Sequence, residues 1–171
     1  TRGASVRLSP LSHVPRIRDL LVDRSRERAA LIAMQATASA PGLPLSAIEP
    51  SSARDRAERE ALSRCSSCAA CVEACPEADS ARGFVGAVAI ARARASDLRP
   101  GVTEAERRSR TLALMRPGGI AECGHVQNCV EVCPESLPLA DVLGVAARAT
   151  TRRGLLGDRL WAAGAKPRAS P

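Results

Sequence analysis

The chain has 171 residues, enough for one domain of ordinary size, and a formal net charge of +7. It contains one Phe, one Trp and no Tyr, so Ala, Leu and Val must fill the core that aromatic side chains usually dominate. The basic residues are interspersed with Asp and Glu, and almost no aromatic side chains are available to stack on bases, which argues against a nucleic-acid partner.

The sequence pattern also argues against a membrane-spanning protein and against a secreted, disulfide-bonded protein. No apolar run approaches the roughly 20 residues needed to span a bilayer, and the first residues do not have the pattern of a signal peptide. The seven cysteines are an odd number at metal-type spacings, which argues against a secreted disulfide framework and indicates a reducing compartment. We therefore expect a soluble or membrane-peripheral protein.

The N-terminal part of the chain carries one predicted strand and one predicted helix. Residues 1–16 alternate around Val6 and Leu8 before two prolines interrupt them, which predicts an edge strand and then a linker. A lone strand is not stable in water, so it should pair with something outside this chain or with a part that is missing. Residues 17–35 have apolar side chains at helical spacing and predict a helix, and the proline-rich stretch 36–52 predicts a connection.

The remaining elements expected from the pattern are all helical. We predict helices over residues 53–64, 84–95, 103–115 and 138–151. Ser51 or Ser52 can cap the first of these, and Thr103 with Glu106 forms a capping box for the third. Gly154 is expected to end the last one. Helix therefore flanks the cysteine-containing segments on both sides.

All seven cysteines fall in two runs. The first run, RCSSCAACVEACP at 64–76, has the spacing C-x2-C-x2-C-x3-C-P, and the second run, ECGHVQNCVEVCP at 122–134, has the spacing C-x5-C-x3-C-P. Short C-x2-C steps let consecutive backbone turns direct thiolates at one iron-sulfur cluster. Pro76 cannot continue a hydrogen-bonded helix, so it turns the chain away after the first run. The sequence therefore predicts a scaffold for two clusters and a role in electron transfer.

The number of cysteines indicates the type of each cluster. In two-cluster ferredoxin modules the last cysteine of each run ligates the other cluster. A complete second run would have a cysteine at the position of Val126, so one ligand set has four members and the other has three. The predicted sets are Cys65, Cys68, Cys71 and Cys133 for a 4Fe-4S cluster, and Cys75, Cys123 and Cys129 for a 3Fe-4S cluster.

Structural zinc is the main chemical alternative, because paired C-x2-C sites also bind zinc. Four cysteines within eleven residues, followed directly by Pro, fit cubane clusters better than they fit zinc. Disulfide bonds fit this spacing less well than either.

Beyond its cysteines, the sequence resembles the iron-sulfur subunit of the succinate dehydrogenase and fumarate reductase family. Both runs match that family's cluster motifs, and VPRIRDLLVDRSR at 14–26 resembles its link out of an N-terminal ferredoxin domain. LMRPGGIAEC at 114–123 and ESLPLADVL at 135–143 resemble the segments that flank the second run. ACPEADSARGFVG and CG-x-x-QNCV are most similar to the menaquinone-linked branch with a di-haem membrane anchor.

The resemblance implies a mainly α fold with a short N-terminal strand and linker. Residues 17–154 would form an α-helical ferredoxin-like domain that binds the two clusters. Residues 1–16 would be the residual strand and linker of a missing 2Fe-2S ferredoxin domain, so a 2Fe-2S cluster is expected on that domain or on a separate subunit. Residues 155–171 would be a tail that either frays or docks on a membrane partner.

The resemblance also implies a relay function in a succinate:quinone oxidoreductase. Electrons would pass between an FAD-containing flavoprotein subunit and a membrane anchor with haem b and quinone, and this chain would perform no bond chemistry itself. It would lie peripherally on the cytoplasmic face of a bacterial inner membrane or the matrix face of the mitochondrial inner membrane.

Four residues are candidates for the environment of the quinone or of the second cluster: Pro76, Ser80, His125 and Val126. Many members of the family carry a Trp where this chain has Ser80, and a His where it has Gly124. His125 is one residue later and could reach a cluster sulfur or relay a proton. The alternative is that His125 is a partly exposed loop residue.

Two other functions are compatible with the cysteine runs. An electron-transfer subunit of the heterodisulfide reductase or glycolate oxidase type also has paired cubane runs, but normally eight cysteines. A third interpretation is a non-catalytic module in which clusters only hold a subunit interface together. Val126 and the linker sequence at 14–26 favour the dehydrogenase family over the first of these, and a redox titration would separate the structural module from both electron-transfer functions.

Overall fold

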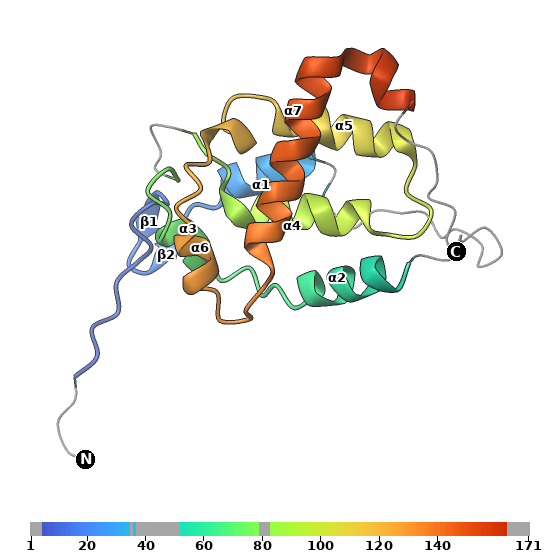
Figure 1. The fold of residues 1–171 in the computed structure, drawn as a ribbon. Coiled ribbons are helices and arrows are strands. Elements are labelled where there is room, and N and C mark those ends of the chain that lie inside the picture. The colour runs from blue at the N-terminus through green and yellow to red at the C-terminus, as the bar shows by residue number, and fades with distance from the viewer. Residues whose placement is uncertain (1–4, 35, 37–51, 79–82, 164–171) are drawn as a thin grey trace.

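The computed structural model describes residues 5–34, 36, 52–78 and 83–163, with the backbone alone described over 157–163. In these residues, seven α-helices and a two-stranded sheet near the N-terminus form the mainly helical fold that the sequence predicts (Figure 1). The helices are α1 (Ser25–Ala33), α2 (Ala53–Ser63), α3 (Ala70–Glu73), α4 (Gly86–Asp97), α5 (Glu104–Leu114), α6 (Asn128–Glu131) and α7 (Leu139–Ala163), with a 3-10 helix, η2, at Ile120–Glu122.

Helix α4 lies at the centre of the arrangement, and α1, α2, α3, α5 and α7 all contact it (Figure 1). Its buried side chains are mostly small and extend around the helix: Ala87, Val88, Ala89, Ile90, Ala91 and Ala93. A helix that is apolar all round is buried on all sides. Because alanine projects so little from the backbone, the neighbouring helices can approach α4 closely, which is how a core with a single Phe is filled.

A close backbone contact ties the start of α4 to the turn before the second run. The backbone N–H of Val85 donates to the carbonyl oxygen of Gly118 at 2.9 Å. A Cβ atom at Gly118 would lie 2.2 Å from the carbonyl oxygen of Gly83, and Gly118 has a φ of +81°, in the left-handed region. This contact requires glycine, and it determines where the chain enters the second run relative to α4.

The prediction of a strand around Val6 and Leu8 is wrong. Residues 5–11 contain no strand, and the side chains of Val6 and Leu8 are 81% and 73% exposed. The only strands in the described residues come later, as an antiparallel hairpin of β1 (Arg16–Arg18) and β2 (Leu21–Val22). The strand pairing is therefore within this chain.

The prediction of one helix over 17–35 is wrong in its first half. The hairpin occupies residues 16–22, and α1 begins only at Ser25. Asp19 at the turn has a φ of +49°, which does not fit a right-handed helix. Ile17, Leu20 and Leu21 have helical spacing in the sequence, but their side chains are more than half exposed on the hairpin, so the spacing does not mark a buried helix face.

The predicted helix starts in the middle of the chain are confirmed. The Oγ of Ser52 accepts a hydrogen bond of 3.0 Å from the backbone N–H of Asp55, which caps α2. Thr103 and Glu106 form the predicted capping box at the start of α5. Helix α4 begins at Gly86, two residues after the predicted start at Phe84.

The prediction that Gly154 ends the last helix is wrong, because α7 continues through it to Ala163. Glycine inside a helix costs about 1 kcal/mol relative to alanine, and packing of α7 on α4 and α5 can offset that cost. The predicted tail 155–171 is thus helical at its start, while residues 164–171 lie outside the described residues. None of the helices described is both long and apolar enough to cross a membrane.

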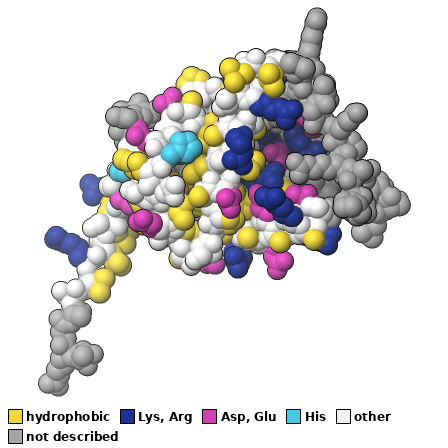
Figure 2. All heavy atoms as spheres, viewed as in Figure 1, with side chains coloured by type: hydrophobic (Ala, Val, Ile, Leu, Met, Phe, Trp, Pro, Cys, Tyr) yellow, Lys and Arg dark blue, Asp and Glu magenta, His cyan; other side chains and the backbone are white. Residues whose placement is uncertain are grey.

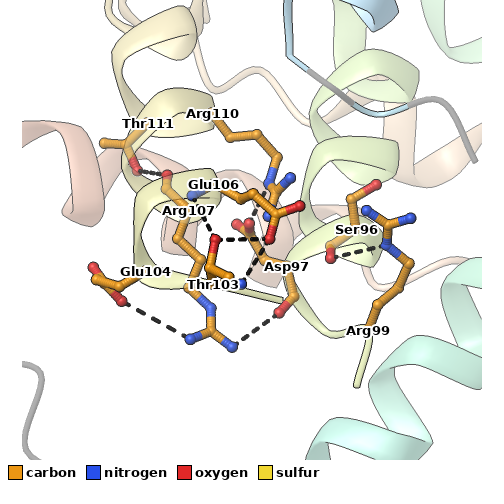
Figure 3. A network of polar contacts seen from close by, with 9 residues as sticks. All are labelled: Ser96, Asp97, Arg99, Thr103, Glu104, Glu106, Arg107, Arg110 and Thr111. Carbon is orange, nitrogen blue, oxygen red and sulfur yellow. Dashed lines mark hydrogen bonds and ion pairs between the residues drawn. The ribbon is translucent and has the colours of Figure 1, made fainter. Parts of the chain in front are cut away.

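A buried ion pair connects the end of α4 to α5 (Figure 3). The Nε of Arg110 lies 2.5 Å from Oδ1 of Asp97, and the side chains of Arg110 and Asp97 are 1% and 24% exposed. Burial raises the pKa of Asp97, and the ion pair with Arg110 opposes that shift. The Nη1 and Nη2 atoms of Arg110 are buried without a hydrogen-bond partner among the described residues, so Asp97 is the main compensation for its charge.

We expect Asp97→Ala to lower the free energy of unfolding by about 3–5 kcal/mol, because it leaves the Arg110 charge buried and unpaired. The double variant Asp97→Ala/Arg110→Met should recover most of that loss. Urea denaturation of the metal-loaded chain measures both. Glu104→Gln is the control, since its pair with Arg107 is about half exposed and should contribute less than about 1 kcal/mol. A cost of Asp97→Ala no larger than that of the control would contradict this account.

Candidate metal centre

The two cysteine runs line two cavities, and the first cavity brings together the four cysteines predicted for the 4Fe-4S cluster. These are Cys65, Cys68 and Cys71 of the first run and Cys133 of the second. Val88 and Ala91 of α4, with Leu137 and Leu139 near the start of α7, supply apolar walls. The last cysteine of the second run thus lies at the cavity of the first run.

The second cavity brings together the three cysteines predicted for the 3Fe-4S cluster: Cys75, Cys123 and Cys129. Phe84 and Ala87 at the start of α4 and Leu143 of α7 form its apolar side, and the loop from Gly124 to Gln127 forms another side. Cys71 lines this cavity as well as the first one, so the two cavities adjoin.

The two runs have the same backbone construction. In the first, Ser67 and Ala69 have φ of +57° and +67° and are followed by the short helix α3, whose second residue is Cys71. In the second, His125 and Gln127 have φ of +54° and +61° and are followed by the short helix α6, whose second residue is Cys129. The residue between the two left-handed positions is Cys68 in the first run and Val126 in the second.

The two runs also contact each other directly. Helices α3 and α6 pack side by side (Figure 1), and the side-chain amide of Asn128 donates a hydrogen bond of 3.0 Å to the carbonyl oxygen of Ala74. These contacts hold the two runs together. The N-terminal segment attaches separately to the first run, where the N–H and hydroxyl of Ser12 donate to the carboxylate of Glu73 at 2.8 and 2.7 Å.

Burial governs the protonation of the thiols. It raises the pKa of Cys71 to about 12, and the nearby thiols of Cys65, Cys129 and Cys68 add to the shift. Burial likewise raises the pKa of Cys123 and of Cys129, with further contributions from neighbouring cysteines. Since a metal binds the thiolate, loading these sites must release protons, and the positive metal must supply the stabilisation that the apolar walls withhold.

The arrangement of the cysteines is compatible with polynuclear clusters. Across the described residues, no three His, Cys, Asp or Glu side chains are placed to hold a single metal ion. The cysteines instead surround two cavities with apolar walls. Thiolates around a cavity are the ligands that iron-sulfur clusters require.

Two of the four candidates for the quinone environment lie at the second cavity. His125 and Val126 line the second cavity and are exposed on its outer side, with 52% of Val126 accessible. Pro76 is exposed and is not among the residues that line either cavity. Ser80 lies outside the described residues.

The sequence analysis missed the cavity walls and one polar contact beside them. Nothing in the cysteine motifs indicates that α4 forms a wall of both cavities, although its run of small apolar residues was visible. The missed contact is a hydrogen bond from the Nη2 of Arg92, on α4, to the Oγ of Ser67 in the first run. No sequence signal links two residues 25 positions apart.

The chain is similar in sequence to known iron-sulfur proteins. Residues 60–137 match the family model for a 4Fe-4S dicluster domain. The chain is 36% identical over 147 residues to the "Succinate dehydrogenase iron-sulfur subunit" of Bacillus subtilis (strain 168), an alignment that covers 85% of this chain. That alignment spans 57% of the length of the Bacillus subtilis protein.

The matched segment contains all seven cysteines, and the helices that carry or flank them enclose both cavities. The similarity over most of the chain extends well beyond the cysteine runs themselves. The chain is therefore a homologue of the succinate dehydrogenase iron-sulfur subunit and contains a 4Fe-4S dicluster domain.

Proposed function

We propose that this chain is the electron-relay subunit of a succinate:quinone oxidoreductase. The observation that carries the proposal is that its two cysteine runs line two adjoining cavities, each of which receives a cysteine from the other run. The similarity to a succinate dehydrogenase iron-sulfur subunit supports this assignment over the heterodisulfide reductase or glycolate oxidase type.

Within that function, the ligand sets are proposed as follows. Cys65, Cys68, Cys71 and Cys133 hold a 4Fe-4S cluster in the first cavity, and Cys75, Cys123 and Cys129 hold a 3Fe-4S cluster in the second. The grouping of the cysteines in the cavities supports these sets. The position of Val126 between two left-handed residues, where the first run has Cys68, supports three ligands in the second set.

When bound, the two clusters supply one-electron transfer. The chain's own residues hold them in sequence, since Cys71 borders both cavities and α3 packs on α6. Val88, Ala91 and Leu139 shield the inner side of the first site from water, and Phe84 and Leu143 do the same at the second. Burial and hydrogen bonds to sulfur are the means by which a protein sets the potential of such a centre.

The two proposed partners exchange electrons with opposite ends of the relay. An FAD-containing flavoprotein subunit would exchange electrons with the 4Fe-4S side, and a membrane anchor with haem b and quinone would exchange them with the 3Fe-4S side. The second cavity opens beside the exposed His125 and Val126, which gives the anchor a place of approach. The chain would then lie peripherally on the cytoplasmic face of a bacterial inner membrane or the matrix face of the mitochondrial one.

A 2Fe-2S centre would complete the relay, on a further domain or on a separate subunit. The N-terminal segment supports this, because its apolar side chains project from the body of the molecule into solvent (Figure 2). Those of Val6 and Leu8 are the most exposed, and Ile17, Leu20 and Leu21 of the hairpin are more than half exposed. These exposed apolar side chains are available for contact with such a domain or subunit.

Val126→Cys tests the number of ligands at the second site. We expect it to convert the 3Fe-4S cluster toward 4Fe-4S, because a thiolate then occupies the position that Cys68 has in the first run. The EPR signal of the oxidised three-iron cluster should decrease, and the iron content should rise. Val132→Cys is the matched control, since Val132 is an exposed valine of the same run and lines neither cavity. A full three-iron signal in Val126→Cys at wild-type loading would refute the assignment.

Cys133 and Cys75 are each proposed to bind the cluster that the other run mainly holds, so replacing them tests the two ligand sets. Cys133→Ala should abolish the signal of the reduced 4Fe-4S cluster and preserve most of the three-iron signal, and Cys75→Ala should do the reverse. EPR of oxidised and dithionite-reduced samples, with iron and sulfide analysis, measures both. The opposite pattern would show that each run holds its own cluster.

The relay is tested with the protein isolated together with its membrane partners. Succinate should reduce the 3Fe-4S signal almost completely in the wild-type complex, because the flavoprotein supplies electrons through the first cluster. Cys68→Ala should slow that reduction by at least about tenfold, since loss of the first centre removes a step of the relay. A three-iron signal that dithionite reduces but succinate does not would count against this function and favour the alternative class.

A further inference from the structure

Helix α4 carries an arginine, Arg92, that reaches the wall of the first cavity. Its neighbour Ala91 lines that cavity, as does Ser67, whose Oγ accepts a hydrogen bond from the Nη2 of Arg92. Ser67 lies directly before Cys68 in the first run. The guanidinium is thus one hydrogen bond away from the loop that carries two of the proposed cluster ligands.

The charge of Arg92 is not neutralised within the described part of the chain. No carboxylate pairs with it there, and its Nε is buried without a hydrogen-bond partner. Arg94 on the same helix differs, because its Nε and Nη2 contact the carboxylate of Glu58 at 2.7 and 2.8 Å. A partly buried cation needs compensation, and a cluster bound by four thiolates is an anion that would supply it.

We propose that Arg92, by its charge and through Ser67, raises the reduction potential of the 4Fe-4S cluster in the first cavity. The inference rests on the proposed function above. Adding one electron to the bound cluster adds a negative charge without making or breaking a bond, and a nearby cation stabilises that charge. The buried apolar side chains of Val88, Leu137 and Leu139 strengthen the effect on the inner side of the cavity, because they exclude screening solvent there.

Ser67 provides the second part of the effect. Its oxygen accepts the hydrogen bond from Arg92, so its own O–H remains to donate toward the cavity that it lines. Hydrogen bonds donated to cluster sulfur raise the potential, and a hydroxyl whose oxygen accepts from a cation is a stronger donor.

The test is a redox titration of the reduced 4Fe-4S signal by EPR, on the full chain loaded with its clusters. We expect Arg92→Gln and Ser67→Ala each to shift the midpoint to lower potential, with the larger shift in Arg92→Gln. Arg92→Lys keeps the charge and should stay closer to the wild-type midpoint than Arg92→Gln. The matched control is the double variant Arg94→Gln/Glu58→Gln, because it removes a neighbouring ion pair without changing the net charge, and it should leave the midpoint unchanged.

If the role of Arg92 is purely structural, its replacement changes the cluster content or the stability of the protein. It then leaves the midpoint potential of the clusters that are still bound unchanged. An unchanged midpoint in Arg92→Gln, or an equal shift in Arg94→Gln/Glu58→Gln, would overturn the inference. If Arg92→Gln does not load a cluster, Ser67→Ala decides, and an unchanged midpoint there also overturns it. A wild-type chain with no reducible 4Fe-4S signal would instead contradict the proposed function itself, which makes the two failures distinguishable.

Discussion

The packing of both cysteine runs against the small side chains of α4 is the constraint on which the rest of this structure depends. Ala91 and Val88 face the first cavity, and Ala87 faces the second, so one helix forms a wall of both. Larger side chains at these positions would fill the space in which the cysteines meet. The shortage of aromatic residues in the composition is therefore compatible with a compact core, because the centre of the molecule needs small residues.

The two runs share one backbone design, and the functional difference between them lies in side chains. Each has two left-handed residues before a short helix, and each ends in a cysteine followed by proline. At one of the matched positions the first run has Cys68 and the second has Val126. At the other, the first run has Ser67 with its bond to Arg92, and the second has the exposed His125. The same scaffold can thus support two centres of different ligand number and electrostatic environment.

The many arginines of the chain have separate roles that the net charge does not reveal. Arg110 is buried against Asp97 and connects α4 to α5, and Arg94 is paired with Glu58 of α2. Arg92 has no such acidic partner among the described residues and lies beside the proposed cluster site. The excess of arginine could suggest a polyanionic partner. At these three positions, however, the arginines pair with carboxylates inside the protein or lie beside the thiolates of the proposed cluster site.

The sequence by itself determined the chemistry of the site. Cysteine spacing indicates clusters regardless of fold, and local rules were sufficient for the cap at Ser52 and the capping box at Thr103, because both depend on residues within one helical turn. The same local rules failed at residues 17–24, where helical spacing occurs in an exposed hairpin, and at Gly154, where packing keeps α7 helical past a residue that often ends helices.

Tertiary structure decided which cysteines meet. Cys133 lines the first cavity in a fold where α3 packs on α6 and the backbone contact at Gly118 joins the entry of the second run to the start of α4. It also decided that Arg92 lies beside Ser67, which no spacing rule relates to it. The physical reason is the same in both cases: ligand type is a property of single residues, whereas proximity between distant residues depends on the packing of the whole core.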